Sequence, residues 1–425
     1  MLHSPVMKNP VICIVGLGYV GLPLAYIFAK KDHDVLGYDL NAERIAELKA
    51  GQDRTRELTE KQLKEIHIRY GTDPAVIHEA DIVILAIPTP VDERNNPDLT
   101  PVESASRTVG KHMKKGAIIV YESTVWPGTT EEICGPILEK ESGMKCGVDF
   151  KLGYSPERVN PGDKEHTIEK IKKIVSGQDA ETLTTLADLY GSVIEAGIHR
   201  AANIKVAEMA KAIENAQRDL NIAFINEIAL LCHKVGIETK DVIDAAATKW
   251  NFLKFLPGLV GGHCIGVDPY YLVEKARQLG MQTQVITAGR ALNDSMSQHV
   301  AEQVAAELKG AKNPRVLVLG LTFKENIPDT RNSKSGDVVK HLAKLGCSVE
   351  VHDPYMPTEI VTKKGWKSGS LKSGPYDAVV LLVPHREYMV EDLTKALKTG
   401  GLVYDLKTLL PRKEIEGKGM RYKAL

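Results

Sequence analysis

The chain has 425 residues, enough for two or three domains with a large buried core. Lys plus Arg and Asp plus Glu number 55 each, so no global basic field points to a nucleic acid. No apolar run approaches membrane-spanning length, residues 1–10 hold no apolar signal segment, and the six cysteines stand singly without a C-x-x-C pair. The composition therefore predicts neither a nucleic-acid partner nor a membrane anchor, metal site or disulfide framework, and it favours a reducing cytoplasm.

A glycine-rich turn follows the first predicted strand. Residues 11–15 are a short apolar run typical of a buried parallel strand, and residues 22–30 favour a helix. Between them runs a G-x-G-x-x-G motif made of Gly16, Leu17, Gly18, Tyr19, Val20 and Gly21. Such glycines admit a dinucleotide pyrophosphate to the helix N-terminus, where unpaired N–H groups favour an anion. A bare tight turn is the alternative, which the flanking strand and helix disfavour.

The acidic residue expected of a dinucleotide-binding fold follows the next strand. Residues 34–38 predict that strand, and Asp39 stands 23 residues after Gly16. A carboxylate at this place accepts hydrogen bonds from the ribose hydroxyls and favours NAD over NADP. Arg44 lies nearby and, as a cation, keeps NADP open as the alternative.

Two further apolar runs, residues 81–87 and 116–121, predict buried strands that are followed by hydroxyl side chains. Thr89 follows the first strand, and Ser123 and Thr124 follow the second. Ligands of open α/β sheets bind at the carboxyl ends of the strands, so these residues are candidate cofactor contacts. Ordinary capping of the strand ends is the alternative.

A loop rich in Pro and Gly, residues 152–162, contains Glu157 and Arg158. The two side chains are either a surface pair or an acid and base that face the substrate. The residue pattern leaves both readings open.

One long helix is predicted over residues 202–235, which contain no Gly or Pro. Its length suits a domain connector or an element of a dimer. Lys211 and Asn215 share one face of this helix, and Glu208 lies one turn earlier. A cation beside an amide can hold a developing oxyanion or a water molecule, whereas a solvated helix face is the alternative.

Cys264 stands among four glycines at 258, 261, 262 and 266, so backbone there can approach a ligand closely. Asp268 follows four residues later, within reach of the thiol or of an attacking water. This polar and flexible setting is unusual for a structural cysteine, although a buried inert thiol remains the alternative.

The carboxyl third repeats the plan of the first sheet. Four predicted strands, residues 315–320, 348–353, 376–384 and 401–405, correspond in order and pattern to those of the amino-terminal region. Its first turn begins at Gly320 but lacks the other two glycines of the motif, so a dinucleotide pyrophosphate fits poorly.

Two cations near this second turn, Lys324 and Arg331, favour a phosphate-bearing substrate over a second dinucleotide. Plain surface charges are the alternative. The predicted fold is therefore α/β, with two Rossmann-like doubly wound sheets joined by a long central helix and a helical dimerisation region. The predicted domains are an NAD-binding domain (1–201), a central helical domain with the Cys264 loop (202–305) and a substrate-binding domain (306–425).

An NAD-binding sheet, a phosphate-binding sheet and a glycine-cradled cysteine together indicate oxidation through a covalent thiol adduct. Oxidation of an alcohol to an acid removes two hydrides, and a cysteine thiohemiacetal can donate the second. Hydrolysis of the resulting thioester by an activated water then releases the acid.

The motifs resemble those of the UDP-glucose/UDP-N-acetylhexosamine 6-dehydrogenase family over the whole chain. The matching stretches are Gly16 to Ala25, Ala86 to Pro90, Tyr121 to Val125, Tyr154 to Arg158, Ala207 to Lys211 with Asn215, Gly261 to Cys264, and Gly320 to Lys324 with Asp329, Arg331 and Ser333. The resemblance implies NAD as cofactor, a UDP-sugar as substrate, no bound metal, and self-association through the long helix as a homodimer or larger assembly.

The resemblance also implies roles for single residues. Cys264 is the expected nucleophile, Lys211 and Asn215 stabilise the oxyanion, and Asp268 and Thr124 handle water and proton transfers. The expected assistant of thioester hydrolysis is Glu157. The expected substrate contacts are Glu157, Arg158, Lys211, Asn215, Gly261, Gly262, Lys324 and Arg331, and those of the cofactor are Gly16, Gly18, Tyr19, Val20, Gly21, Asp39, Arg44, Thr89, Ser123 and Thr124.

The residues after Cys264, from Ile265 to Tyr271, are similar to those of the branch that acts on N-acetylated UDP-hexosamines. GlcNAc, GalNAc and ManNAc stay open within that branch, and UDP-glucose is the alternative outside it. The chain departs from the branch before Pro257, where Lys254 takes a shifted position. A two-electron hydroxyacid dehydrogenase of the 6-phosphogluconate type, using Lys211, and a non-catalytic NAD sensor are less favoured alternatives.

Overall fold

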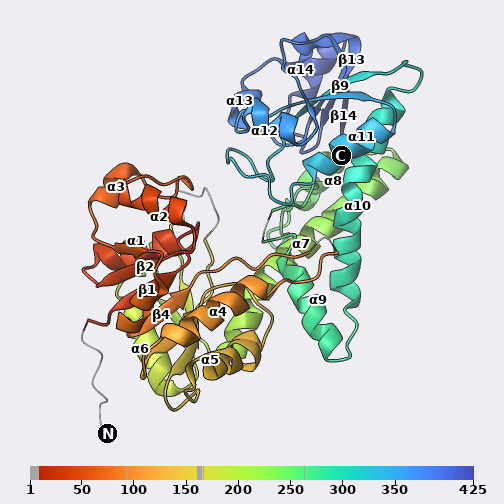
Figure 1. Ribbon diagram of the computed structural model, residues 1–425. Coiled ribbons are helices and arrows are strands. Elements are labelled where there is room, and N and C mark those ends of the chain that lie inside the picture. The colour runs from red at the N-terminus through yellow and green to blue at the C-terminus, as the bar shows by residue number, and fades with distance from the viewer. Residues whose placement is uncertain (1–8, 93, 160–164, 166, 263) are drawn as a thin grey trace. The chain divides into compact units, whose positions relative to one another are not determined.

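The computed structural model describes residues 9–92, 94–159, 165, 167–262 and 264–425 (Figure 1). The chain divides into two compact units, Met1–Glu214 with Tyr270–Gly280, and Asn215–Pro269 with Met281–Leu425. Among the described residues, no helix combines the length and the apolar character needed to cross a membrane.

The first unit contains an eight-stranded sheet in the order β3-β2-β1-β4-β5-β6-β7-β8. Neighbouring strands are parallel except for the antiparallel pair of β6 and β7. The central strands are continuous apolar runs because helices cover both faces of such a sheet. The strands are β1 (Ile12–Val15), β2 (Val35–Tyr38), β3 (Arg69–Gly71), β4 (Ile82–Leu85), β5 (Ile118–Tyr121), β6 (Lys151–Tyr154), β7 (Lys173–Gly177) and β8 (Ile198–Arg200).

Helices connect these strands and bury their apolar faces against the sheet. The connecting helices are α1 (Gly21–Lys30), α2 (Ala42–Lys49), α3 (Glu60–Lys64), α4 (Thr100–His112), α5 (Gly135–Ser142) and α6 (Ala180–Gly191), with short turns η1 (Pro74–Glu79), η2 (Thr129–Cys134) and η3 (Ile168–Lys170). Side-chain caps fix where two of them begin. Asn41 accepts from the first N–H groups of α2, and Asp179 does so at α6. One core cluster joins α1 and α6 to the sheet.

The second unit contains a six-stranded, fully parallel sheet in the order β11-β10-β9-β12-β13-β14. Its strands are β9 (Arg315–Leu319), β10 (Ser348–His352), β11 (Lys367–Ser368), β12 (Tyr376–Leu381), β13 (Leu397–Asp405) and β14 (Arg421–Ala424). Its helical elements are α11 (Ser335–Lys344), α12 (Thr358–Lys363), α13 (Arg386–Met389), η4 (Leu393–Ala396) and α14 (Arg412–Gly417).

Both sheets have the strand order of a doubly wound nucleotide-binding fold, which confirms the predicted α/β class and the predicted repeat. Most strand boundaries lie within two residues of the prediction, and the larger differences concern β12 and β13. β12 ends at Leu381, where the N–H groups of both Leu382 and Val383 turn to the Leu319 carbonyl and the ladder stops. β13 begins at Leu397, earlier than expected, since its next three residues are exposed and give no apolar signal.

The predicted long helix is present as α7 (Ile204–Val235), a 32-residue element. Two shorter helices follow, α8 (Thr239–Ala246) and α9 (Asp268–Gln278). A second long helix, α10 (Gln284–Glu307), was not predicted, and it packs against α11 in the second unit (Figure 1). Its buried face includes the polar residues Arg290, Asn293 and Ser297, which hides the helical period.

Candidate active site

The three glycines of the first turn differ in their backbone conformation and in the space available for a side chain. Gly16 has a φ of +90°, and a Cβ there would lie 2.7 Å from the Ala86 carbonyl oxygen. At Gly21 a Cβ would lie only 1.8 Å from the Gly16 oxygen, so this glycine lets α1 start against the turn. A Cβ at Gly18 would meet no atom within 4 Å. The exposed Gly18 is thus where a pyrophosphate can approach the backbone.

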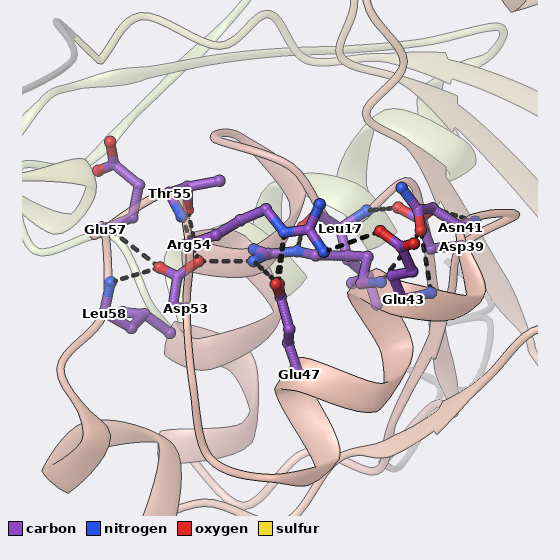
Figure 2. A network of polar contacts seen from close by, with 11 residues as sticks. Leu17, Asp39, Asn41, Glu43, Glu47, Asp53, Arg54, Thr55, Glu57 and Leu58 are labelled. Carbon is purple, nitrogen blue, oxygen red and sulfur yellow. Dashed lines mark hydrogen bonds and ion pairs between the residues drawn. The ribbon is translucent and has the colours of Figure 1, made fainter. Parts of the chain in front are cut away.

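Asp39, the acidic residue after β2, stabilises the same turn through hydrogen bonds (Figure 2). One oxygen of Asp39 accepts from the Leu17 N–H at 2.8 Å, and the other accepts from the Asn41 N–H at 2.8 Å. The carboxylate is half-buried, so it keeps a solvent-facing side that can accept further hydrogen bonds.

Arg44 is buried beneath the turn and is held from both sides. Its side chain is 6% exposed, its Nε donates to the Leu17 carbonyl at 2.9 Å, and its Nη1 lies 2.8 Å from Asp53 Oδ1. Asp53 in turn accepts from the N–H groups of Glu57 and Leu58 (Figure 2). Burial alone raises the pKa of Asp53, but the hydrogen bonds and the Arg44 cation outweigh it and lower the pKa. No motif or spacing in the sequence marks Asp53 as part of this turn.

The hydroxyl side chains after β4 and β5 lie in different surroundings. Ser123 is buried and donates to the Ile87 carbonyl at 2.6 Å, so it ties the end of β5 to the end of β4. Thr89 and Thr124 are half-buried. The Ser123 hydroxyl therefore has the strand-end capping role that was the alternative for it.

Glu157 has one oxygen engaged and one unpaired. Its Oε1 accepts from the N–H groups of Arg158 at 2.6 Å and Val159 at 2.5 Å. Its Oε2 is buried without a hydrogen-bond partner among the described residues. Buried polar atoms are nearly always paired in native proteins, so an unpaired carboxylate oxygen indicates a place for a ligand or water.

Arg158 is anchored on two elements rather than exposed as half of a surface pair. Its Nη2 lies 2.8 Å from Glu214 Oε1 on α7, and its Nη1 donates to the Lys172 carbonyl at 2.7 Å. The anchored guanidinium fixes the loop that carries Glu157.

The face of α7 with Glu208, Lys211 and Asn215 is buried, with 0%, 7% and 5% exposure, so a solvated helix face is excluded. Glu208 accepts from the N–H groups of Gly128 at 2.5 Å and Thr130 at 2.9 Å. Burial raises the pKa of Glu208 to about 7, against the opposing effect of these two N–H groups. Glu208 thus fastens the segment that follows Thr124 to the helix.

The Cys264 turn belongs to the second unit and is followed directly by the first residue of α9, Asp268. The Cys264 carbonyl accepts from the N–H groups of Val267 at 3.1 Å and Asp268 at 2.8 Å, and the residue is half-buried. Asp268 is buried and its Oδ2 accepts from Asn215 Nδ2 at 2.5 Å. His263, part of the motif noted above, lies outside the described residues. The structure thus brings two of the predicted catalytic side chains, Asn215 and Asp268, into contact.

The glycines before Cys264 allow this turn to pack against the loop that follows β9. A Cβ at Gly261 would lie 2.7 Å from the Asn332 carbonyl oxygen, and one at Gly262 would lie 2.7 Å from the Phe323 ring. Gly262 also has a φ of +86°, and its carbonyl accepts from Asn332 Nδ2 at 3.3 Å. The thiol-bearing turn therefore lies beside the loop of the predicted cations. Phe323 and Asn332 were not identified from the sequence.

The same turn is held from below by buried amides. Asn226 on α7 accepts from the Gly258 N–H at 2.8 Å and donates to its carbonyl at 3.0 Å. Asn226 also donates to Asn293 on α10 at 2.9 Å, and Asn293 donates to Asp219 at 2.7 Å. Arg290 completes the network through a 2.6 Å ion pair with Asp219. These residues fix where the Cys264 turn begins, and no local pattern had marked them.

The predicted cations of the second unit differ in exposure. Arg331 is about half exposed and forms a forked pair with Asp329, with a shortest distance of 2.6 Å. Lys324 is half-buried. Lys254, the residue at the shifted position, lies 2.8 Å from Asp244 and is half exposed.

Comparison with known proteins assigns all three regions of the chain. Residues 10–194 match the NAD binding domain of the UDP-glucose/GDP-mannose dehydrogenase family, residues 205–295 its central domain, and residues 317–412 its UDP binding domain. The chain is 49% identical to UDP-N-acetyl-D-glucosamine 6-dehydrogenase of Pseudomonas aeruginosa, over 95% of this chain and 98% of the relative. It is also 49% identical to Protein CapL of Staphylococcus aureus, over 96% of this chain and 98% of that protein.

A solved structure shares the complete architecture. The UDP-D-ManNAc dehydrogenase of Pyrococcus horikoshii matches with a TM-score of 0.89 at 30% identity, covering 97% of this chain and 98% of that one. The glycine turn, the Asp39 carboxylate and the doubly wound sheet therefore define an NAD-dependent dehydrogenase. The chain belongs to the UDP-glucose/GDP-mannose dehydrogenase family, and its C-terminal sheet is the UDP-binding domain of that family.

Proposed function

We propose that this enzyme oxidises the C6 hydroxyl of a UDP-N-acetylhexosamine to the uronic acid, with UDP-GlcNAc as the first candidate among the GlcNAc, GalNAc and ManNAc forms. The identity of 49% to UDP-N-acetyl-D-glucosamine 6-dehydrogenase of Pseudomonas aeruginosa exceeds the 33% to UDP-N-acetyl-D-mannosamine dehydrogenase of Methanococcus maripaludis. The residues after Cys264 support the same branch.

The observation that carries the proposal is the packing of the Cys264 turn against the Phe323–Asn332 loop of the UDP-binding sheet. A UDP-sugar bound to that sheet would present its sugar to the turn. Loss of a hydride and a proton from the C6 hydroxyl gives an aldehyde. Cys264 then adds to this aldehyde, forming a C–S bond while the carbonyl oxygen gains the thiol proton. Loss of a hydride and a proton from this thiohemiacetal gives a thioester. NAD, when bound, accepts one hydride in each of the two oxidations.

The chain's own side chains hold charge and move protons in these steps. Lys211 and Asn215 stabilise the C6 oxygen as it gains negative charge, because both are buried donors on one face of α7. Asp268, fixed by Asn215, and Thr124 take part in proton transfer. Glu157 activates the water that hydrolyses the thioester, for which its unpaired Oε2 is suited.

Further contacts with substrate and cofactor complete this assignment. The proposed additional substrate contacts are Arg158, Gly261, Gly262, Lys324 and Arg331, and the proposed cofactor contacts are Gly16, Gly18, Tyr19, Val20, Gly21, Asp39, Thr89, Ser123 and Thr124. Arg44 acts on the cofactor indirectly, because it is held beneath the turn. None of the six cysteines, all of which are described, forms a disulfide, which suits the proposed cytoplasmic location.

We also propose three domains, at 1–201, 202–305 and 306–425, and a homodimer or larger assembly formed through α7. Large apolar side chains along this helix are exposed, as expected of an interface, namely Val206, Met209, Ile213, Phe224, Leu231 and Val235.

The substrate is tested by comparing kcat/KM for UDP-GlcNAc, UDP-GalNAc, UDP-ManNAc and UDP-glucose with saturating NAD. UDP-GlcNAc should have the highest value, and mass spectrometry of the product should show the uronic acid. A preference for UDP-glucose would overturn the N-acetylhexosamine assignment.

The nucleophile is tested by Cys264→Ala, which should lower kcat by about 10³-fold or more. Cys146→Ala is the matched control, because Cys146 is also half-buried and its thiol hydrogen-bonds with the Gln178 side chain in the first unit. Equal activity of the two variants would remove the thiol from the mechanism.

A further inference from the structure

A buried ion pair lies beneath the Glu157 loop in the first unit. Lys173 on β7 and Glu122 at the end of β5 are 3% and 1% exposed, and their Nζ and Oε2 atoms are 2.7 Å apart. The other oxygen of Glu122 accepts from the Tyr190 hydroxyl at 2.6 Å. Burying two charges is costly, and a well-packed apolar pair of similar volume often serves stability equally well. Stability of the sheet alone therefore does not account for these residues.

The ammonium group of Lys173 reaches beyond its partner to the predicted base. It donates to the Pro156 carbonyl at 3.2 Å, which fixes the backbone directly before Glu157. It also lies 3.8 Å from Glu157 Oε2, the oxygen that is buried without a hydrogen-bond partner. Glu157 Oε1 is occupied by two backbone N–H groups, so Oε2 is the oxygen left for a water molecule.

We propose that Lys173, held in place by Glu122 and Tyr190, is a positioning residue for Glu157 that sets the rate of thioester hydrolysis. This inference rests on the proposed function of Glu157. Lys173 keeps the Glu157 carboxyl in its observed position, whereas Glu122 provides the buried counter-charge that retains the ammonium group.

The charged and titratable groups around Glu157 show why one cation matters. Glu57, Glu122 and Tyr190 all interact electrostatically with Glu157. Burial, followed by Asp53 and then Glu157, raises the pKa of Glu57 to about 7. Burial also raises the pKa of Glu122, against the effect of the Lys173 charge. The Arg158 guanidinium is directed to Glu214, whereas the Lys173 ammonium lies 2.7 Å from Glu122 and 3.8 Å from Glu157.

In the hydrolysis step Glu157 Oε2 takes a proton from water while the water oxygen bonds to the thioester carbonyl carbon. The C–S bond then breaks and the sulfur leaves as the thiolate, which recovers a proton before the next cycle. The step consumes one water and changes no oxidation state. A displaced Glu157 slows this step and leaves both hydride transfers unchanged.

The test is single-turnover kinetics of the full-length enzyme with UDP-GlcNAc and excess NAD, with rapid quenching and intact-mass measurement of the protein. Lys173→Met should keep both rates of NADH formation within about threefold of the wild type. It should slow deacylation by about 10-fold to 100-fold, so that an acyl adduct accumulates. Lys173→Arg, which keeps the cation, should restore most of the deacylation rate.

Two further variants serve as controls for this test. Lys151→Met, on the neighbouring strand β6, breaks a 2.8 Å ion pair with Asp179 at the start of α6 and should leave deacylation unchanged. Glu122→Met with Lys173→Met removes the whole buried pair, avoids an unpaired buried charge, and should show the same slow deacylation in a folded protein.

The outcomes separate this inference from the proposed function. Wild-type deacylation in the Lys173 variants, together with slow deacylation in Glu157→Gln, would overturn the role of Lys173 alone. Wild-type deacylation in Glu157→Gln as well would overturn both the inference and the assigned role of Glu157. Equal slowing of hydride transfer and deacylation in the Lys173 variants would show a general structural role and also contradict the inference.

Discussion

The two sheets begin with the same backbone device and then diverge. Gly16 after β1 and Gly320 after β9 have φ angles of +90° and +92°. Their N–H groups donate to the carbonyls of Tyr38 and His352, the last residues of the neighbouring strands, at 2.8 and 2.9 Å. Both sheets thus turn the chain at the point where the strand order reverses, which is where such folds bind nucleotides.

The residues after these glycines explain why the two turns bind different ligands. Gly18, above which space is open, corresponds to Thr322, which is buried and donates to the Lys324 carbonyl at 2.9 Å. Gly21, where a Cβ would clash, corresponds to Glu325. In the second turn, side chains therefore occupy the space that a pyrophosphate would need. Position by position, one fold plan provides an NAD site in one unit and a UDP-binding domain in the other.

The acidic residue after the second strand of each sheet, Asp39 or Asp353, shows the same contrast between an open and a filled site. Asp39 and Asp353 accept equivalent backbone hydrogen bonds, from Leu17 at 2.8 Å and from Leu321 at 2.6 Å. Asp39 keeps a solvent-facing side, whereas Asp353 is buried and lies 3.1 Å from the His385 Nε2. The Asp39 carboxylate can therefore accept hydrogen bonds from a ribose, whereas the Asp353 carboxylate is buried and hydrogen-bonded within the protein.

The largest effect is expected from making the first turn resemble the second. Gly18→Thr should weaken NAD binding by at least about 100-fold, or roughly 3 kcal/mol, because the side chain would occupy the path of the pyrophosphate. Folding should be preserved, since a Cβ at this position meets no atom within 4 Å. Calorimetric titration with NAD and with UDP measures the two affinities separately, and UDP affinity should not change. NAD binding at wild-type affinity would show that the glycine turn is not the cofactor site.

Asp353→Asn should destabilise the second unit by about 2–4 kcal/mol, because it breaks a buried acceptor shared by backbone N–H groups and His385. Burial opposes ionisation of Asp353, but these hydrogen bonds outweigh it and lower the pKa. The stabilisation is therefore present above the unfolded-state pKa of about 3.9 and is lost as the pH falls through the lower folded-state value.

Hydrogen exchange of β9 and β12 peptides at pH 7 and near pH 3 measures this loss. The variant should differ from the wild type at pH 7 and approach it near pH 3. Asp39→Asn, the matched control, should cost about 1 kcal/mol and weaken NAD binding instead. A larger destabilisation by Asp39→Asn than by Asp353→Asn would contradict the contrast between the two acids.

The smallest effect concerns the choice between NAD and NADP. Asp53→Asn should release the Arg44 guanidinium from its 2.8 Å ion pair, and raise kcat/KM for NADP relative to NAD by about 10-fold. Glu47→Gln is the control, because its distance to Arg44 is 3.7 Å and the pair is weaker. An unchanged ratio in Asp53→Asn would mean that Arg44 does not influence cofactor choice.

The sequence predicted the parts of the molecule that local patterns encode. The glycine turn, Asp39 and the buried strands follow from spacing and apolar runs, and the 32-residue α7 follows from the lack of Gly and Pro. The repeat of the sheet was also visible, because both halves use the same order of strand, turn and acid. The bounds of α10 were not predicted, because its buried polar residues interrupt the apolar pattern of a helix.

The residues that hold the site in place could not be predicted, because their partners are distant in sequence. Lys173 stands in a lysine-rich stretch that resembles surface charge, yet its partner Glu122 is 51 residues away. Asn226 reaches the turn at Gly258 across 32 residues, and Phe323 contacts Gly262 only in the folded unit. Such contacts depend on tertiary packing, for which one sequence carries no local signal.

The most direct test of this account is the number of NADH molecules formed per molecule of limiting UDP-GlcNAc with excess NAD. Two NADH are predicted, because the thioester route removes two hydrides from the same carbon. One NADH per molecule would contradict the account, since it would mean that oxidation stops at the aldehyde and that Cys264 has no covalent role.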